Sequence, residues 1–177
     1  DVTAGIAEET LFYDKQNHAD YPIPAKKPEV DKSAALSVEY NKVESLQTKK
    51  VAMHVAEGVG EESMEKITLP LEDGGATPVF IGPKIGALKT KQGGTLMIEH
   101  SLLTEASVLY DALYIPDGDE AVKALLEEPD VFQFVNEMYR HCKPMAFGQK
   151  ASEILQHTYI KKHEDDWGIV IESADRG

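Results

Sequence analysis

The sequence predicts an α/β domain, a doubly wound parallel sheet with helices on both faces, preceded by an extended linker. Two observations support this fold class. From residue 48 onward, short apolar runs alternate with segments whose apolar residues recur at helical spacing. The runs are almost continuously apolar, which is typical of strands covered on both faces. Because residues 1–47 lack this alternation, we divide the chain into a linker at 1–47 and a domain at 48–177.

The linker is predicted from its prolines. Three of the chain's nine prolines fall in "YPIPAKKP" at residues 21–28, where they prevent a long helix or a central strand. We expect at most one helical turn, near residues 7–15. The linker also carries apolar side chains that favour contact with another surface, namely Leu11, Phe12, Tyr13, Tyr21 and Ile23.

The first half of the domain predicts two strands with a helix between them, followed by a hairpin. Met64, Ile67 and Leu71 recur at helical spacing, and the helix they predict ends at two glycines. Pro70 is expected to disturb its last turn. The segments in order are a strand at 49–56, the helix at 61–75, a strand at 77–82, a hairpin at 86–100 and a helical or turn stretch at 102–109.

The second half continues the alternation. The segments are a strand at 111–118, helices at 119–128 and 130–142, a strand at 143–147, a helix at 148–157 and a strand at 167–173. Asp130 is expected to cap its helix, because Gln133 follows at the spacing of a capping box. The apolar face of that helix comprises Val131, Phe134, Val135, Met138 and Cys142. Alternation of this kind implies right-handed crossovers, so we predict a flavodoxin-like fold.

Three loops follow strands at the predicted carboxyl edge of the sheet, where doubly wound folds place ligands and catalytic groups. They are "AEGVGEE" at 56–62, "IPDGD" at 115–119 and "FGQK" at 147–150. Together they resemble the intracellular-protease branch of the class I glutamine amidotransferase-like superfamily. The resemblance implies a glutamate in the first loop, a Pro-Gly-Gly turn in the second and a cysteine on a strained elbow in the third.

This chain departs from that pattern at its working positions. Glu61 or Glu62 could occupy the glutamate position, but Asp117 replaces the first glycine of the turn. Gly148 stands where the elbow cysteine belongs, and the residue after it, Gln149, is not a histidine. A nucleophilic mechanism then has no attacking atom. We therefore interpret these residues as a vestigial elbow and expect no catalytic residue in the domain.

A longer stretch, residues 37–172, resembles the C-terminal domain of large-subunit catalases. The resemblance is carried by "SVEYNKVESLQTKKVAMHVAEGV", "LTEASVLYDALYIPDG" and "FVNEMYRHCKPMAFGQKASEIL". It implies a haem-containing core that decomposes hydrogen peroxide, joined to this domain by a proline-bearing linker in a homotetramer. It also implies a domain without a cofactor of its own, which contacts the core and neighbouring subunits. Such a domain would stabilise the tetramer or protect unfolding client proteins as a chaperone does.

Two other functions stay open at this point. One is a degenerate hydrolase or glyoxalase with a displaced nucleophile, and the missing elbow cysteine counts against it. The other is a small-molecule binding module that uses the vacated corner beside Gly148. A ligand or an empty pocket at that corner would favour the binding module.

The composition argues against nucleic acids and membranes as partners. The net charge is −13, and no basic stripe offsets it, so phosphate backbones would be repelled. The sequence has no run of about 20 apolar residues and no signal peptide at its start. We expect a soluble protein, and the compartment, cytoplasmic or secreted, stays open.

Cysteine and histidine, the two reactive residue types considered, have simpler interpretations than a functional site. Cys142 is the single cysteine, and its place on the apolar face of a helix predicts a buried, inert thiol. His54 lies in the centre of a core strand, where we expect a buried and hydrogen-bonded ring. His157 and His163 do not have the spacing of a closed zinc site, so we expect no metal.

Overall fold

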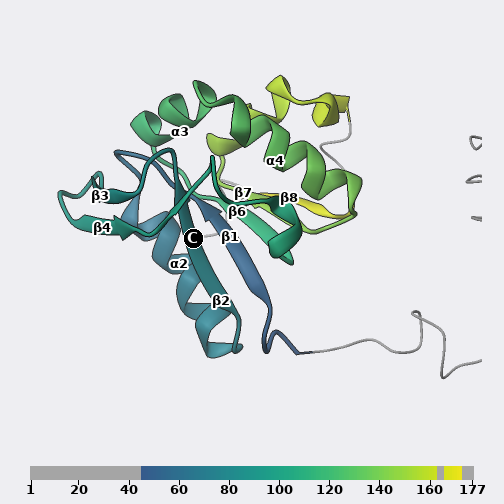
Figure 1. Ribbon diagram of the computed structural model, residues 1–177, viewed down its shortest axis with the longest axis horizontal. Coiled ribbons are helices and arrows are strands. Elements are labelled where there is room, and N and C mark those ends of the chain that lie inside the picture. Colours follow the sequence, from purple (N-terminus) through teal and green to yellow (C-terminus); the bar gives the residue numbers. More distant parts are fainter. Residues whose placement is uncertain (1–44, 163–165, 173–177) are drawn as a thin grey trace, which may run out of the picture. The chain divides into compact units, whose positions relative to one another are not determined.

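Figure 1 shows the computed structural model, which describes residues 45–162 and 166–172. Most of the predicted linker lies outside the described residues, so its extended structure stays a prediction. The strands are β1 (Lys50–His54), β2 (Thr77–Gly82), β3 (Gly86–Lys89), β4 (Thr95–Ile98), β5 (His100–Ser101), β6 (Ala112–Ile115), β7 (Met145–Phe147) and β8 (Ile169–Ile171). The α-helices are α2 (Glu61–Asp73), α3 (Asp119–Leu126) and α4 (Pro129–Arg140). The 3₁₀ helices are η2 (Ser107–Leu109), η3 (Ala151–His157) and η4 (Tyr159–Lys162).

Six of the described strands form one parallel sheet in the order β5-β2-β1-β6-β7-β8. In the middle of this sheet, Met53 of β1 lies level with Phe80 of β2 and Tyr114 of β6. The chain builds the sheet outward from β1 in both directions, which is the doubly wound arrangement. Strands β3 and β4 form a separate antiparallel hairpin, as the sequence predicts. The predicted fold class is confirmed.

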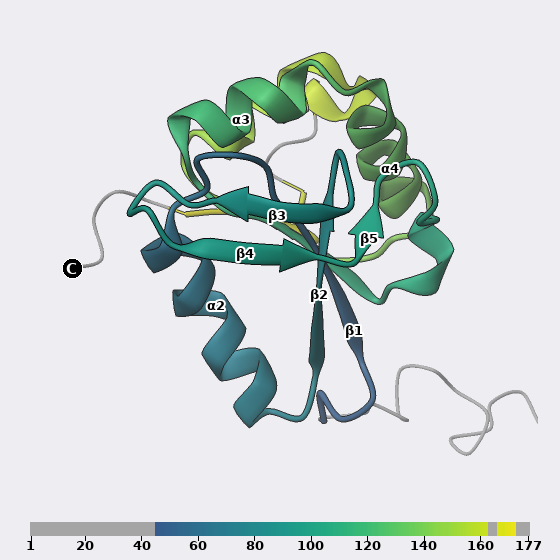
Figure 2. The ribbon, with the colours of Figure 1, turned by 60° about the vertical axis from the view of Figure 1, so that its left-hand side comes forward.

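Helices cover both faces of the sheet (Figures 1 and 2). Helix α2 packs on one face, where the Thr68 hydroxyl lies 3.5 Å from the sulfur of Met53. Helix α4 packs on the other, where the ring centroids of Phe134 and His54 are 4.5 Å apart. Met53 and His54 are neighbours in β1, and successive side chains of a strand point to opposite faces. These two contacts therefore assign α2 and α4 to opposite layers.

Helix α4 confirms the predicted apolar face but not the predicted cap. Val131, Phe134, Val135 and Met138 are all buried in the core. The helix begins at Pro129, so Asp130 lies within its first turn and makes no capping hydrogen bond. The predicted cap is wrong because proline suits the first helical position, where its fixed φ fits and its missing N–H is not needed.

The prediction for Cys142 is also wrong. Helix α4 ends at Arg140, and Cys142 beyond it is exposed, with a φ of 53°. The amide of Cys142 donates to the Tyr139 carbonyl at 2.9 Å, and that of Lys143 donates to the Met138 carbonyl at 3.0 Å. This pair of bonds is a Schellman motif, which places a left-handed residue just past the helix. The motif removes Cys142 from the buried stripe and leaves it in solvent.

Two short elements differ from the expected ones. The helix expected at 148–157 is the 3₁₀ helix η3 and begins only at Ala151. Strand β5, which apolar patterning does not predict, pairs two residues with Ile81 and Gly82 at one edge of the sheet. Neither difference changes the layers.

Candidate functional site

The three loops of the predicted elbow do meet at the carboxyl ends of β1, β6 and β7. The Gly60 amide donates to the Asp117 carbonyl at 2.9 Å, and the Gly148 amide donates to the Ile115 carbonyl at 2.8 Å. A Cβ at Gly118 would come within 2.6 Å of the Gly58 carbonyl oxygen, so the first two loops touch backbone to backbone. The structure thus brings Asp117, Gly148 and Gln149 together at one corner.

The carboxylate of Asp117 occupies the centre of this corner. It accepts hydrogen bonds from the amides of Gln149 at 3.1 Å, Lys150 at 2.8 Å and Ala151 at 3.2 Å. These amides open η3 and would otherwise lack acceptors, since the first turn of a helix leaves its N–H groups free. Asp117 therefore caps η3 across a separation of more than 30 residues.

Gly148 is glycine because Asp117 is beside it. A Cβ at position 148 would lie 2.4 Å from Oδ1 and 2.6 Å from Cγ of Asp117. Both distances are far inside van der Waals contact, so a cysteine or serine there would displace the carboxylate or the loop. The position that would carry a nucleophile is filled by the side chain of a neighbouring loop.

The side chains of the two glutamates in the first loop make different contacts. The carboxylate of Glu61 accepts a hydrogen bond from the Thr90 hydroxyl, and its amide donates to Oε1 of Gln92 at 3.0 Å. Both partners lie in the turn of the β3–β4 hairpin, so Glu61 ties α2 to that hairpin. Glu62 lines a surface hollow together with Glu65 and Lys66. The sequence could not separate these roles, since both residues occupy the first turn of α2.

Ser63 and Tyr114 complete the corner, and the sequence analysis missed both. The two hydroxyl oxygens are 2.8 Å apart, and the Ser63 hydroxyl also accepts the Asp117 amide at 3.0 Å. Burial raises the pKa of Tyr114. A serine in a helix and a tyrosine in a strand have no distinctive spacing, so no pattern could have found them.

An ion pair borders the corner on its solvent side. The Lys150 ammonium donates to the Asp119 carboxylate, and Lys91 lies 3.9 Å from the same carboxylate. The hydrogen bond from Lys150 lowers the pKa of Asp119, and the same bond raises the pKa of Lys150. Both groups are exposed, so the pair orients the loops and contributes little stability.

His54 is buried as predicted, but it is not hydrogen-bonded as predicted. Within the described residues, neither ring nitrogen has a hydrogen-bond partner. Burial lowers the pKa of His54 to about 3, so the ring is neutral at ordinary pH. Its contact with Phe134 lies in the α4 layer of the core. The ring therefore carries the free-energy cost of a buried polar group without a hydrogen bond.

The hydrogen-bonding groups described at the corner are paired with one another. Asp117 is committed to three amides, the Ser63 hydroxyl to Tyr114 and Asp117, and position 148 has no side chain. Across residues 45–162 and 166–172, no three histidine, cysteine, aspartate or glutamate side chains are grouped so that they could hold a metal ion. Over the same ranges, no helix has the length and apolar character that a membrane crossing requires.

Known protein structures share the fold. Drosophila melanogaster DJ-1beta is 17% identical with a TM-score of 0.60, over 72% of this chain and 76% of its own. Toxoplasma gondii DJ-1 in its oxidized form is 18% identical with a TM-score of 0.58, over 62% of this chain and 61% of its own. At this level of identity the similarity shows the flavodoxin-like fold alone.

The related sequences identify the family of the chain as well as its fold. A catalase of Alkalihalophilus pseudofirmus is 31% identical over 132 residues, which cover 75% of this chain and 19% of that protein. Catalase HPII of Mycobacterium avium is 32% identical over 126 residues, which cover 68% of this chain and 18% of that protein. This chain thus spans about a fifth of the length of the relatives it matches. The family model described as the C-terminal domain found in long catalases matches residues 47–176, and the chain belongs to that family.

Proposed function

We propose that this chain is a domain without chemistry of its own, which stabilises the homotetramer of a larger haem catalase. The observation that carries the proposal is the closed corner, where the Asp117 carboxylate fills the space that a side chain at 148 would need. Decomposition of hydrogen peroxide is then the task of the haem-bearing region of the parent protein. The proposal is supported by the long catalases among its relatives, four fifths of whose length lies outside the match.

The two alternatives, an enzyme and a small-molecule binding module, have less support. A hydrolase or glyoxalase with a displaced nucleophile would need a reactive group near the corner, and the only cysteine of the chain, Cys142, follows α4 just before β7. The start of β7 is the end of the sheet opposite to the corner. A binding module would need free space at the corner. The position of a side chain at 148 is taken by atoms of Asp117, but a surface hollow of about 480 Å³ lies next to it, lined by Gln149, Lys150 and Asp119 among others. This alternative therefore keeps a candidate site, but no observation points to a ligand for it.

The proposal is tested by removing the domain from the full-length parent. We expect haem content and initial oxygen release per haem to be unchanged when residues 48–177 are deleted, because no catalytic group is lost. Activity should disappear at a lower temperature, because subunit contacts are lost. A fall in the initial rate per haem with the assembly intact would contradict the proposal, since it would place the domain in the chemistry.

A second candidate function, chaperone-like protection, is favoured by exposed apolar side chains on an acidic protein. Leu103, Val108 and Trp167 are among the large hydrophobic residues in solvent, and the net charge of −13 would keep a bound client soluble. The test is light scattering from a heated, aggregation-prone enzyme, with the whole chain and with a form that begins at Thr48. Scattering that is unchanged at several-fold molar excess of the whole chain would remove this candidate.

A further inference from the structure

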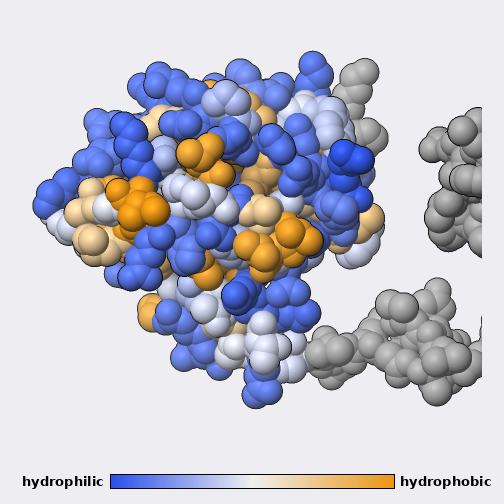
Figure 3. Space-filling model, in the orientation of Figure 1, coloured by the Kyte–Doolittle hydropathy of each residue, from blue (hydrophilic) through white to orange (hydrophobic). Residues whose placement is uncertain are grey.

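The amino-terminal ends of the strands carry a group of exposed hydrophobic side chains. Val108 and Leu109 precede β6 and are 71% and 56% exposed, and Trp167 precedes β8 and is 93% exposed. Leu46, also exposed, precedes β1. Amino ends of parallel strands share one edge of a sheet, so these side chains lie at the end opposite to the closed corner. Figure 3 shows hydrophobic side chains gathered in separate groups on a largely hydrophilic surface.

Hydrogen bonds join these positions into one surface. The Lys143 ammonium donates to the carbonyls of Ser107 at 2.9 Å and Tyr110 at 2.6 Å, which fixes η2 beside the start of β7. The Asp111 carboxylate accepts from the Lys49 ammonium at 3.0 Å and from the amide of Lys50 at 2.9 Å, which fixes the start of β6 beside β1. The surface is therefore continuous from β1 to β7, and we call it the amino-end surface.

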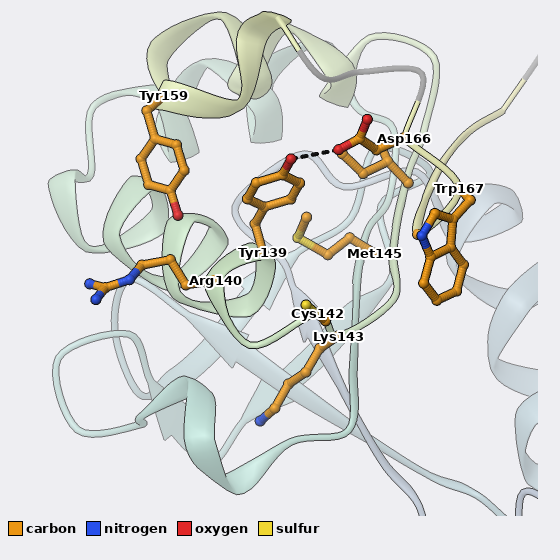
Figure 4. A pocket seen from close by; sticks show the side chains of 10 residues that line it. Tyr139, Arg140, Cys142, Lys143, Met145, Tyr159, Asp166 and Trp167 are labelled. Carbon is orange, nitrogen blue, oxygen red and sulfur yellow. Dashed lines mark hydrogen bonds between the residues drawn. The ribbon is translucent and has the colours of Figure 1, made fainter. Parts of the chain in front are cut away.

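A hollow of about 420 Å³ extends the amino-end surface towards β8. Lys143 and Trp167 both line it, with Tyr139, Tyr159 and Met145 as further walls (Figure 4). The Tyr139 hydroxyl donates to Asp166 at 2.5 Å, which holds one aromatic wall in place. In Figure 4 the Trp167 indole stands at the outer side of the hollow and the Lys143 ammonium points away from it. A fixed hollow beside an exposed tryptophan matches the anchors and pockets of protein interfaces.

The amino-end surface carries charges of both signs. Its basic residues are Lys49, Lys50, Arg140 and Lys143. Acidic residues lie among them: Asp111 binds Lys49, Glu137 accepts from the Ser107 hydroxyl, and Asp166 lines the hollow. A partner surface with an apolar centre and polar groups around it fits this arrangement.

We infer that the amino-end surface is where the catalase region of the parent protein docks, an inference that rests on the proposed function. All residues before 45 join the domain through β1, at this same end. The relatives have four fifths of their length outside the matched part, so the tethered partner is large. A covalent tether raises the effective concentration of that partner at the surfaces within its reach, and the amino-end surface is where the tether enters the domain. Tryptophan, tyrosine and arginine, which Trp167, Tyr159 and Arg140 supply, are the residues enriched in interface centres.

Cys142 is a native probe of this docking, because it lines the hollow and is exposed in the 177-residue chain. Its alkylation rate would be measured by peptide mass spectrometry in the isolated chain and in the full-length catalase. We expect labelling in the full-length protein to be slower by about tenfold or more, since it then requires opening of the interface. A Lys123→Cys variant, at the opposite end of the sheet, should be labelled equally in both. Equal labelling of Cys142 in both proteins would overturn the inference.

Charge insertion gives a second test with a matched control. Val108→Asp with Leu109→Asp would place two carboxylates on the amino-end surface of the full-length protein. Ile85→Asp with Met97→Asp would place two on the β3–β4 hairpin, where the native side chains are 64% and 62% exposed. The quantity compared is the urea concentration that dissociates the tetramer, and thermal unfolding of the isolated variants confirms that each still folds.

We expect the first pair to lower the dissociation midpoint and the hairpin pair to leave it unchanged. If the hairpin pair lowers the midpoint and the first pair does not, the domain still supports the assembly but the docking surface is wrong. If neither pair and not even deletion of residues 48–177 changes the midpoint, the proposed function itself fails.

Discussion

At the scale of single residues, Asp117 and Gly148 form one unit. The carboxylate satisfies three amides of η3 and leaves 2.4 Å between its oxygen and a Cβ at 148. An aspartate in the second loop and a glycine at the elbow are thus each required by the other. This coupling explains in physical terms why the elbow has no nucleophile.

The first prediction is that substitutions at these two positions are not additive. Gly148→Ala should lower the free energy of unfolding by about 1–3 kcal/mol, because its methyl group overlaps the carboxylate. Asp117→Ala should lower it by about 0.5–2 kcal/mol, because the amides at the start of η3 lose the carboxylate that caps them. In the double variant the overlap with the carboxylate is gone, and only the approach of the new Cβ to the backbone nitrogen of residue 117, at 2.7 Å, remains. Gly148→Ala should therefore cost about 1 kcal/mol less than in the native background. Urea unfolding of the four proteins measures this, and additive effects would argue against the coupling.

The second prediction concerns His54, whose pKa burial lowers to about 3 in the folded chain, against an ordinary histidine pKa of 6.5. Below pH 6.5 the unfolded chain binds a proton that the folded chain does not, so stability falls as pH falls from 6.5 towards 3. At pH 5 this loss amounts to about 2 kcal/mol. His54→Leu should therefore lose less stability than the native chain between pH 7 and pH 5, by about that amount. Urea unfolding of both proteins at the two pH values measures this. If both lose the same free energy of unfolding between pH 7 and pH 5, the assignment is contradicted.

At the scale of elements, the sequence predicts most of the fold and misses local geometry. The core strands are predictable because their apolar runs are buried on both sides, and α4 because its apolar residues repeat at helical spacing. Strand β5 is not predictable, since its two residues pair only with Ile81 and Gly82 across the fold. The vestigial elbow is flagged by Gly148, but the filling of the corner depends on a contact between Asp117 and residues 149–151, which no spacing encodes.

The third prediction tests the end of α4. Cys142 has a φ of 53° in the Schellman motif, a conformation that glycine adopts at little cost. Cys142→Gly should raise the free energy of unfolding by about 1 kcal/mol, since the left-handed region disfavours a side chain. Cys142→Ala is the control, because it removes the thiol and keeps the Cβ, and it should change stability by less than about 0.5 kcal/mol. If the alanine variant gained as much as the glycine variant, the thiol and not the backbone would be the source of the strain.

At the scale of the whole molecule, the two ends of the sheet differ in kind. At the carboxyl end, where this fold places its ligands, Asp117 takes the position of a side chain at 148, whereas the amino end carries exposed Val108, Leu109 and Trp167 beside a hollow. A domain arranged in this way is suited to contact other parts of a protein. The chain belongs to the family of C-terminal domains found in long catalases, so the contact would be made within such a catalase.

The most direct test of this account is the urea midpoint for dissociation of the proposed full-length assembly, measured by sedimentation velocity with and without residues 48–177. A domain that stabilises the assembly should, when deleted, lower the midpoint while the folded subunits keep their haem, because contacts between subunits are lost and the haem site is untouched. The full-length Asp117→Asn variant is a control, since it alters the closed corner and leaves the amino-end surface intact. Equal midpoints for the full-length and deleted proteins would show that the domain does not hold the tetramer together.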